Sequence, residues 1–431
     1  MATQVKDSED LAARLCLSLL QELLSGYTPG DFAVRLWEGT RWAPEPLQPS
    51  RCTLLLSHPG ALRRMLATPN QLNLAEAYVY GDFDVEGDLE ALVAMGDHLR
   101  SQSHTLWEKL NLARALRSLP DSGPQRRGRQ AARLRGEKHS LDRDRQAIAY
   151  HYNVSNDFYA LFLDRRMVYS CAYFADPEEE LDLAQERKLD YVCRKLRLRP
   201  GDRLLDIGCG WGGLMLHAAQ HYGAEVVGVT LSQPQAELAS QRLRQAGLAD
   251  RCRVDLLDYR QLDPAERFDK LVSIGMVEHV GADHLPEYFR KAWELLRPGG
   301  VFLNHGIADH ASRPPAEARG YLNTYVFPDG ELPPLHAVLR AAEEARFEVR
   351  DAESLREHYA LTLRHWVRRL EACHQEALRH VDEATYRIWR LYMAGSANWF
   401  ARGYLGVFQA LLVKPDRGIS GLPLTRGDWY K

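Results

Sequence analysis

The sequence predicts an α/β protein in which a parallel β-sheet carries helices on both faces. Residues 204–213 read LLDIGCGWGG, an apolar strand that runs into a glycine-rich turn. Four further strand-like runs then alternate with helical patterns, at residues 224–229, 253–257, 270–273 and 300–304. Alternating strands and helices are typical of a parallel sheet, and ligands then bind at the carboxyl ends of its strands.

The turn after the first strand is typical of a site for a nucleotide-like molecule. Glycines such as Gly208 and Gly210 can adopt positive φ and let backbone N–H groups approach a ligand at a helix N-terminus. The order Asp206-x-Gly208-x-Gly210 differs from the G-x-G-x-x-G of dinucleotide-binding folds, and the next strand ends in Thr230-Leu231-Ser232 without an acid. A nicotinamide cofactor is therefore disfavoured. The turn alone would also fit a plain packing role.

Residues 1–120 are expected to form a separate, smaller α+β domain. Apolar side chains recur at helical spacing over residues 11–24, and short strands are predicted at 32–36 and 52–56. Another helix is expected to begin at Ala61, after a turn. The acids at 82, 84, 86 and 88 do not follow the spacing of a calcium loop, so a turn-rich surface is expected there.

A linker with a basic face is expected at residues 121–145, before a catalytic domain at 146–431. Its basic residues are Arg126, Arg127, Arg129, Arg133, Arg135 and Lys138. Such a charge run can be a solvated connector. It can also be attracted to anionic lipid headgroups, because each basic side chain near a membrane surface contributes about 1 kcal/mol.

Composition excludes several classes of protein. A length of 431 residues suggests two or three domains, and a net charge of −3 argues against extended nucleic-acid binding. The seven cysteines are odd in number and form no C-x-x-C, so we expect neither a disulfide framework nor a metal site, and a reducing cytoplasm fits. No apolar run approaches the roughly 20 residues of a membrane span, and the N-terminus is too polar for a secretory signal.

Six motifs carry a resemblance to a known family. They are HYNVSNDFY at 151–159, YSCAYF at 169–174, VTLSQPQ at 229–235, EHVG at 278–281, NHGI at 304–307 and HYALTLRHW at 358–366. In order and spacing they resemble the cyclopropane-fatty-acyl-phospholipid synthases, which include the mycolic acid cyclopropane synthases. The resemblance implies a Rossmann-like methyltransferase sheet that uses S-adenosylmethionine (SAM). It also implies an N-terminal domain similar to sterol-carrier folds, for lipid handling or dimerisation.

The resemblance implies the residues of a SAM site. Asp206 would begin the loop, Gly208 and Gly210 would contact the methionine end, and Gln235 would bind the ribose hydroxyls. Asp258 would lie near the adenine. The other residues assigned to this site are Thr230 and Leu231 after the second strand and a lid formed by Tyr152, Tyr169 and Ser170.

The resemblance also implies a bicarbonate ion held beside the methyl group. Glu278 would accept its O–H, His305 and Tyr359 would donate, and the backbone N–H groups of Cys171 and Ile307 would complete the cage. Charge-assisted hydrogen bonds of this kind are short and strong.

Each cage residue also fits a structural role. Glu278 could cap a helix, His305 could be a satisfied core histidine, Cys171 a small buried hydrophobe and Tyr359 a helix anchor. Residues 386–408, rich in aromatic side chains, are expected to be helical and to line an acyl tunnel, or else to belong to an ordinary core.

The expected reaction is methylene transfer from SAM to a cis double bond in the acyl chains of membrane phospholipids, which forms a cyclopropane ring. Alternatives are a methyltransferase that leaves a methylene branch, and a silent lipid-binding protein. Asn153 and Gly306 stand where many family members have Asp and Thr, which leaves the product open. RNA or amine methylation would need a basic aromatic groove or an acidic pocket. We expect a cytoplasmic enzyme on the inner face of the cell membrane, possibly a homodimer.

Overall fold

The fold is that of a computed structural model, which describes residues 2–28, 30–45, 48–66, 68, 70–101, 105–309 and 319–430. The chain divides into two compact units. The described residues of the first unit lie within 2–131, 319–325 and 382–398, and the second unit holds the others. This grouping of residues by contact differs from the domain boundaries expected near residues 120 and 145. Those boundaries divide the chain by the expected role of each part, and they stay a prediction.

The first unit contains a four-stranded sheet with the strand order β2-β1-β3-β4. β1 is parallel to β3, and the other two pairs are antiparallel. The helix predicted at 11–24, the strands predicted at 32–36 and 52–56, and the helix predicted from Ala61 are confirmed. The elements are α1 (Ala2–Leu23), β1 (Phe32–Arg35), β2 (Arg41–Trp42), β3 (Cys52–Leu56), α2 (Ala61–Leu66), α3 (Gln71–Val79), β4 (Phe83–Gly87), α4 (Leu89–Ser101), α5 (Leu106–Ser118) and α13 (Arg319–Tyr325).

Residues from late in the chain complete the first unit. They belong to α17 (Glu383–Ala401), whose residues up to Asn398 are grouped here. The buried Arg390 donates to the Tyr78 hydroxyl at 2.8 Å and to the Val85 carbonyl at 3.2 Å. Hydrogen bonds from a guanidinium are stronger than neutral ones, so these contacts fix this part of α17 to the sheet of the unit.

The second unit is built on a seven-stranded sheet with the order β10-β11-β9-β8-β5-β6-β7. β5 to β9 are parallel to one another, which confirms the five predicted strands. β11 is antiparallel to β9 and to β10, so the sheet is mixed rather than wholly parallel. The strands are β5 (Arg203–Ile207), β6 (Glu225–Thr230), β7 (Cys252–Leu256), β8 (Phe268–Ile274), β9 (Leu296–Asp309), β10 (Glu348–Ser354) and β11 (Leu405–Val413).

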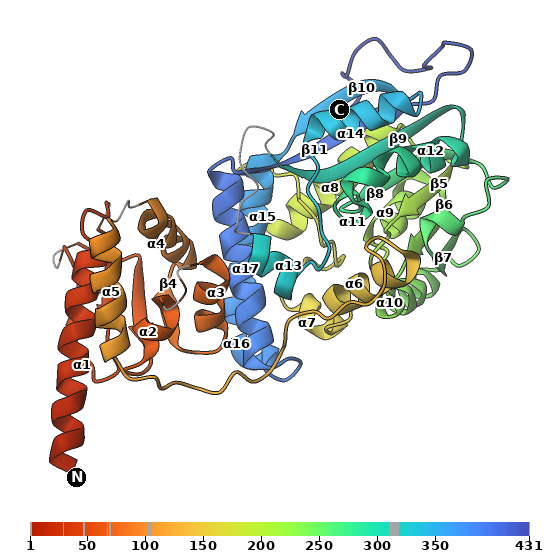
Figure 1. The fold of residues 1–431 in the computed structure, drawn as a ribbon. Helices are drawn as coiled ribbons and strands as arrows, with labels where there is room; N and C mark the ends of the chain where they lie inside the picture. The colour runs from red at the N-terminus through yellow and green to blue at the C-terminus, as the bar shows by residue number, and fades with distance from the viewer. Residues whose placement is uncertain are drawn as a thin grey trace. The chain divides into compact units, whose positions relative to one another are not determined.

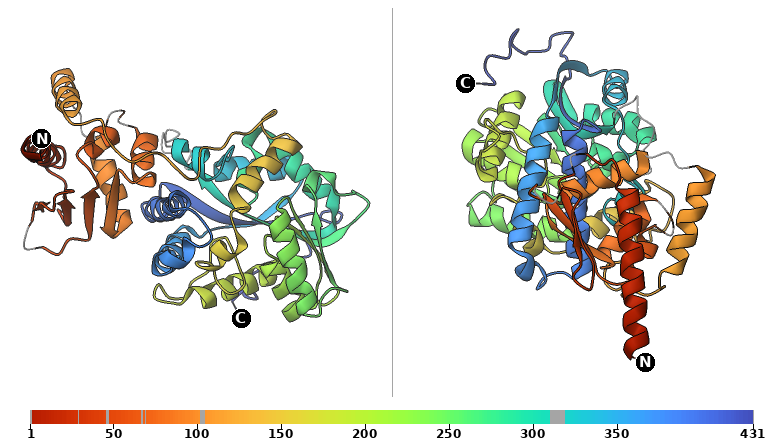
Figure 2. Two further views of the ribbon diagram at one scale, coloured as in Figure 1. Left: turned by 90° about the horizontal axis from the view of Figure 1, so that it is seen from below. Right: turned by 90° about the vertical axis from the view of Figure 1, so that its left-hand side faces the viewer.

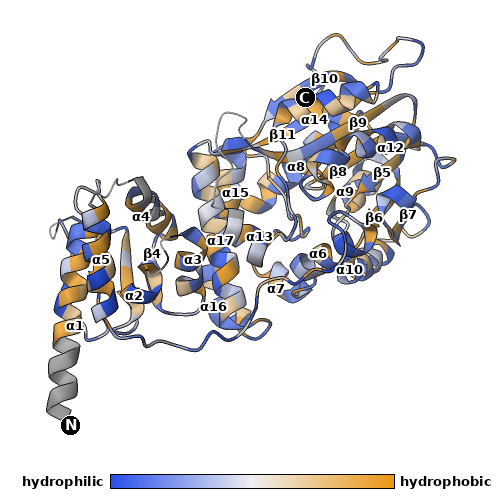
Figure 3. Cartoon of the chain, viewed as in Figure 1, coloured by the Kyte–Doolittle hydropathy of each residue, from blue (hydrophilic) through white to orange (hydrophobic). Residues whose placement is uncertain are grey.

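Helices cover both faces of this sheet, as Figures 1 and 2 show. Successive strand residues point to opposite faces, so Leu204 packs in a core with α8 and α9 while Leu205 packs in a core with α12 and α14. The apolar bands of these helices are coloured orange in Figure 3. The helices are α6 (Leu141–Tyr152), α7 (Asn156–Ala160), α8 (Leu181–Leu196), α9 (Gly213–Tyr222), α10 (Gln233–Gln245), α11 (Val277–Val280), α12 (Leu285–Leu295), α14 (Leu335–Glu344), α15 (Arg356–Ala372) and α16 (His374–Ala377), with short 3-10 turns η1 (Tyr259–Gln261) and η2 (Ala282–His284).

The helix predicted over residues 386–408 was wrong at its C-terminal end. α17 ends at Ala401, and Tyr404 and Phe408 lie outside it, Phe408 on β11. Gly403 has φ of +68°, a conformation that ends a helix. The following run is buried along almost its whole length, and such a strand has no alternation that distinguishes it from a helix.

More of the basic side chains in the linker contact other residues of the chain than the sequence suggested. Arg126 pairs with Glu76 in the first unit, where Arg129 also lies over the ring of Trp389. In the second unit Lys138 pairs with Glu331. Three of the six basic side chains, Arg126, Arg129 and Lys138, therefore contact residues outside the linker. Among the described helices, none has both the length and the apolar character that crossing a bilayer requires.

Candidate functional site

The glycine turn lies where β5 is flanked by β6 on one side and β8 on the other. This is the point of an α/β sheet where a crevice opens at the strand ends. Gly208 and Gly210 have φ of +84° and +53°, in the region that favours glycine. A Cβ at Gly210 would meet no heavy atom within 4 Å, so open space borders the turn. The N–H groups of Gly208 and Cys209 donate to the Val229 carbonyl at 2.9 and 3.1 Å and fix the turn to β6.

A buried cation lies beneath this turn. Lys188 of α8 is fully buried, and its Nζ donates to the Ser170 hydroxyl at 2.8 Å. Burial lowers the pKa of Lys188 to about 8. Burial also raises the pKa of Asp206, near the end of β5, to about 7, and the charge of Lys188 limits this rise. Sequence reasoning missed Lys188. The available signal was its position seven residues after Leu181, on the buried stripe of α8.

The segment that carries Tyr169, Ser170 and Cys171 is held by two helices. Gln185 of α8 donates to the Ser170 carbonyl at 2.8 Å, and Thr362 of α15 accepts from the Ala172 N–H at 3.0 Å. Cys171 is fully buried, and burial raises the pKa of its thiol. A thiol in such surroundings is inert, so only the backbone of Cys171 is available for a role in the site.

The loop after β6 is hydrogen-bonded to the segment 151–159. The Ser232 hydroxyl donates to Asn153 at 2.8 Å, and the Thr230 hydroxyl donates to the Gln235 amide oxygen at 2.8 Å. From the glycine turn, Trp211 Nε1 donates to Asn156 at 2.7 Å. Leu231, half-buried, follows Thr230 directly. These bonds bring the residues predicted for the cofactor site into one region.

Aromatic rings join the predicted lid to the far side of the site. The ring of Tyr169 lies 6.1 Å from Tyr152 and 5.1 Å from Trp366, between ring centroids. Trp366 in turn lies 6.1 Å from Tyr359, a buried residue of α15 whose ring is 4.7 Å from Phe400. The structure therefore connects a predicted cofactor residue to a predicted cage residue through packed rings.

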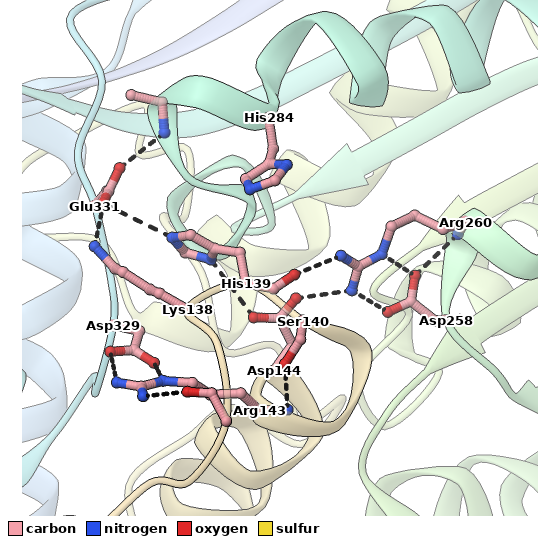
Figure 4. Close-up of polar contacts among 12 residues, drawn as sticks. Lys138, His139, Ser140, Arg143, Asp144, Asp258, Arg260, His284, Asp329 and Glu331 are labelled. Carbon is pink, nitrogen blue, oxygen red and sulfur yellow. Dashed lines mark hydrogen bonds and ion pairs between the residues drawn. The ribbon is translucent and has the colours of Figure 1, made fainter.

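Asp258 ends the loop after β7, and Arg260 binds its carboxylate. Arg260 Nε and Nη2 contact the two carboxylate oxygens at 2.8 and 2.6 Å. The same guanidinium donates to Asp144 at 2.7 Å and to the His139 carbonyl at 2.9 Å (Figure 4). The cofactor residue predicted here is thus oriented by a bidentate partner.

His139 and Glu331 extend this network to the turn that carries Glu278 (Figure 4). His139 lies between Asp144 at 3.5 Å and Glu331 at 3.7 Å, and the hydrogen bond with Asp144 raises the pKa of its imidazole. Glu331 accepts from the Ala282 N–H at 2.8 Å, and its own N–H donates to the Glu278 carbonyl at 2.9 Å. We call His139, Asp144, Arg260 and Glu331 the His139 clamp.

Glu278 is a buried carboxyl with one oxygen engaged. Its Oε1 accepts from the Ile307 N–H at 2.7 Å, and its Oε2 is buried without a hydrogen-bond partner among the described residues. Burial raises the pKa of Glu278 to about 7. The Ile307 N–H, predicted to bind an anion, therefore already donates to Glu278.

His305 is a neutral donor held by the strand next to it. It lies opposite Gln409 in the β9–β11 pair, and Gln409 Nε2 approaches His305 Nδ1 at 3.2 Å. Burial holds the pKa of His305 well below its usual range, so the ring is neutral. An amide N–H that donates to Nδ1 would leave the ring proton on Nε2. Nε2 is buried and has no hydrogen-bond partner among the residues described.

A chain of contacts brings the remaining cage residues together. Leu355, just before α15, donates its N–H to the Val407 carbonyl at 2.8 Å, and its carbonyl accepts from the Cys171 thiol at 3.7 Å. Val407 lies opposite Ile307 in the β9–β11 pair. Over the described part of the chain, no group of three or more His, Cys, Asp or Glu side chains is arranged to hold a metal ion.

Comparison with known proteins shows the family to which the chain belongs. The family model "Mycolic acid cyclopropane synthetase" matches residues 139–410. A probable fatty acid methyltransferase from Pseudomonas putida is 43% identical over 404 residues, which are 92% of this chain and 96% of that protein. The cyclopropane-fatty-acyl-phospholipid synthase of Escherichia coli K12 is 35% identical over 64% of this chain and 69% of its own length.

A solved structure extends the comparison to three dimensions. The mycolic acid cyclopropane synthase CmaA1, crystallised with SAH and CTAB, has a TM-score of 0.59 and 37% identity, and the match covers 62% of this chain and 97% of that one. The family model covers more than half of the sequence. The chain therefore belongs to the mycolic acid cyclopropane synthetase family and is a SAM-dependent methyltransferase of the cyclopropane synthase type.

Proposed function

We propose that the protein transfers a methylene group from SAM to the cis double bond of unsaturated acyl chains in membrane phospholipids, and that a cyclopropane ring results. The observation that carries the proposal is the pair of buried, unsatisfied atoms Glu278 Oε2 and His305 Nε2. Buried polar atoms in native proteins normally have partners, so an unpaired acceptor and an unpaired donor indicate a small polar ligand.

The cofactor half of the proposal assigns SAM to the crevice at the end of β5. Open space beside Gly210 and the positive φ of the turn fit a ligand that lies against backbone. Because the Gln235 amide oxygen accepts from Thr230, Gln235 would offer its NH₂ group to a ribose hydroxyl. Tyr152, Tyr169, Leu231 and Asp258 would complete the pocket. SAM supplies an electrophilic methyl group there.

The ligand between Glu278 and His305 would be bicarbonate. Bicarbonate has one O–H, which suits the acceptor Glu278 Oε2, and a negative charge, which suits the His305 N–H donor. Tyr359 and the backbone N–H groups of Cys171 and Ile307 are the further donors, with Ile307 shared with Glu278. Bound bicarbonate would supply the base that removes a proton after the alkene has attacked the methyl carbon.

The residues would contribute orientation and the exclusion of water. The alkene carries positive charge once it has accepted the methyl group, and aromatic faces such as those of Tyr169 and Trp366 favour a cation. His305 stays neutral because of its burial, so it adds no positive charge beside the cation. These groups are held in place before the charge develops, which is how a preorganised site lowers a barrier.

A second candidate product is a methylene-branched acyl chain. It is favoured by the identity of 43% over 92% of the chain to a protein named a probable fatty acid methyltransferase. The two reactions share the methyl transfer, after which the methylene branch needs a hydride shift from the methyl-bearing carbon to the neighbouring cationic carbon before a methyl proton leaves. Mass spectrometry after derivatisation of alkenes separates them, because a cyclopropane retains no double bond.

Replacing Glu278 by Gln tests the catalytic assignment. We expect Glu278→Gln to lose about 100-fold or more in kcat/KM, because the amide presents a donor where the O–H of the anion needs an acceptor. The assay is incubation of the full chain with labelled SAM and unsaturated phospholipid vesicles. Glu287→Gln, on the exposed side of α12, is the matched control and should keep wild-type activity. Full activity of Glu278→Gln would show that the anion site is misassigned.

A further inference from the structure

Helix α5 of the first unit begins with three large apolar side chains in solvent. Leu106, Trp107 and Leu110 are 81%, 68% and 58% exposed. They are three of ten large hydrophobic residues classed as exposed in the described chain, and they fall within five positions of one helix. Single exposed hydrophobic residues are ordinary, whereas a cluster of them marks an interaction site. We call these three residues the α5 tip.

The α5 tip is part of a formed helix and not a frayed end. Thr105 and Glu108 make a capping box, in which each side chain bonds the backbone N–H of the other residue, at 3.3 and 2.7 Å. At the opposite end of α5, Leu116 and Leu119 are buried, and Arg63 of α2 donates to the Leu119 carbonyl at 3.0 Å. The helix is therefore anchored at one end and presents the tip at the other.

Cations follow the tip along the same face. Leu106, Leu110, Arg114 and Arg117 recur at spacings of four and three, which places them on one side of the helix. Arg114 lies about 12 Å along the axis from Leu106 at 1.5 Å per residue. Glu108 comes two positions after Leu106 and lies on another side of the helix, so the charged residues of this face are Arg114 and Arg117. Figure 3 shows orange and blue segments alternating on α5.

This order of side chains fits a lipid surface. Helices bound to a bilayer surface bury their apolar residues about 5–10 Å into the boundary between headgroups and acyl chains. Because the basic residues of α5 follow the tip along the axis, the helix would enter by its N-terminal end, and Arg114, about 12 Å behind Leu106, would then lie near the phosphates. Trp is the residue type that is enriched at that boundary. We propose that α5 docks the protein onto anionic phospholipid bilayers, with the α5 tip among the acyl chains and with Arg114 and Arg117 at the headgroup phosphates.

A second copy of the chain fits the surface less well. Large side chains bury roughly 150–250 Å² each, so three partly covered ones offer less than the about 800 Å² per partner of a stable interface. A bilayer needs no matching shape and supplies the opposite charge. The docking surface belongs to the first unit and the proposed catalytic residues belong to the second. The proposal rests on the proposed function only in that the substrate is a membrane lipid.

Vesicle binding tests the proposal with the full-length protein. We expect wild type to sediment with phosphatidylcholine vesicles that contain phosphatidylglycerol, and the triple variant Leu106→Gln, Trp107→Gln, Leu110→Gln to bind them at least about tenfold more weakly. The double variant Arg114→Gln, Arg117→Gln should lose its affinity mainly at low salt and for anionic vesicles. Leu424→Gln, at a residue that is fully exposed elsewhere in the chain, should bind as wild type does.

Two further readouts keep the outcomes apart. Unchanged vesicle binding by the triple variant, with unchanged thermal melting, would overturn the proposal. Light scattering gives the molar mass of the triple variant. If wild type is a dimer and the triple variant is a monomer that still binds vesicles, the proposal is overturned and α5 is assigned to self-association. Activity on detergent-dispersed phospholipid should stay at the wild-type level in the triple variant and fall on vesicles. Wild type that binds vesicles but modifies no lipid would refute the proposed reaction and leave the docking surface in place.

Discussion

Lys188 is the residue whose contribution the sequence concealed. Its amino group contacts Ser170 and its charge acts on Asp206, so one buried cation lies close to two residues assigned to the cofactor. A lysine in a helical pattern normally indicates a solvated position. Here the apolar stripe of α8 continues through Lys188, and only the packing of the strands against α8 shows that the side chain is enclosed.

We expect Lys188→Met to weaken the binding of S-adenosylhomocysteine about tenfold or more. The variant removes the donor to Ser170 and the charge that stabilises the Asp206 carboxylate, so a proton bound to Asp206 would replace its negative charge. Isothermal calorimetry measures the affinity. Lys195→Met, at another buried lysine of α8 that pairs with Glu353, should reduce stability while it leaves this affinity unchanged. An equal loss of affinity for S-adenosylhomocysteine in both variants would mean that Lys188 has only a structural role.

Among the elements, the parallel strands were predictable and the antiparallel edge was not. β5 to β9 each follow a turn or a helical stretch. Short apolar runs in β5, β6, β8 and β9 and the alternation of apolar and charged residues in β7 are patterns that the sequence displays directly. β11 follows α17 with a connection of only three residues, so its apolar run reads as more helix. β10 has no regular burial pattern. The pairing that places Gln409 opposite His305 was therefore invisible, and with it the tautomer of the histidine.

The His139 clamp ties the start of α6 to the loops that carry Asp258 and Glu278, and its strength should depend on pH. Asp144 and Glu331 raise the pKa of His139 above its ordinary value of 6.5, while the nearby Lys138 opposes them. A raised pKa in the folded state stabilises the fold fully below the unfolded pKa and loses that contribution as the pH rises through the folded pKa. The clamp is thus strongest below about pH 6.5.

We expect His139→Asn to lower the melting temperature more at low pH than at high pH. Asn tolerates the φ of +61° at this position, so the variant removes the imidazole without adding backbone strain. The loss should be about 1–2 kcal/mol below pH 6 and should shrink as the pH rises through the raised pKa of His139. Melting curves measured at a series of pH values test this, with the exposed His336→Asn as control. A difference from wild type that does not vary with pH would contradict a charged His139.

At the scale of the whole molecule, the chain returns to its N-terminal unit late in the sequence. Residues 319–325 and 382–398 belong to that unit although they follow most of the second. A reading of the sequence from end to end has no signal for this, because both segments resemble the helices around them. The half-buried Arg387 and the buried Arg390 are the local evidence, since a helix that only packed through apolar contacts would not need them.

We expect Arg390→Met to destabilise the first unit by about 2–4 kcal/mol. The change leaves the Tyr78 hydroxyl and the Val85 carbonyl without the guanidinium that bonds them in a buried site. Urea unfolding followed by circular dichroism should show the loss, and Arg379→Met, on an exposed side chain, should show none. Unfolding that is unchanged by Arg390→Met would mean that the C-terminal segment contributes little to the unit.

The pairing of β9 with β11 has a consequence for how the chain can change length. Side chains alternate sides along a strand, so a residue added or removed between Ala401 and Leu405 that shifted β11 by one position would turn Gln409 away from His305. Without the contact from the Gln409 amide, the imidazole of His305 could carry its proton on either ring nitrogen. The length of the loop between α17 and β11 can thereby affect which nitrogen of His305 donates. An insertion in this loop could alter the chemistry although no active-site side chain has been replaced.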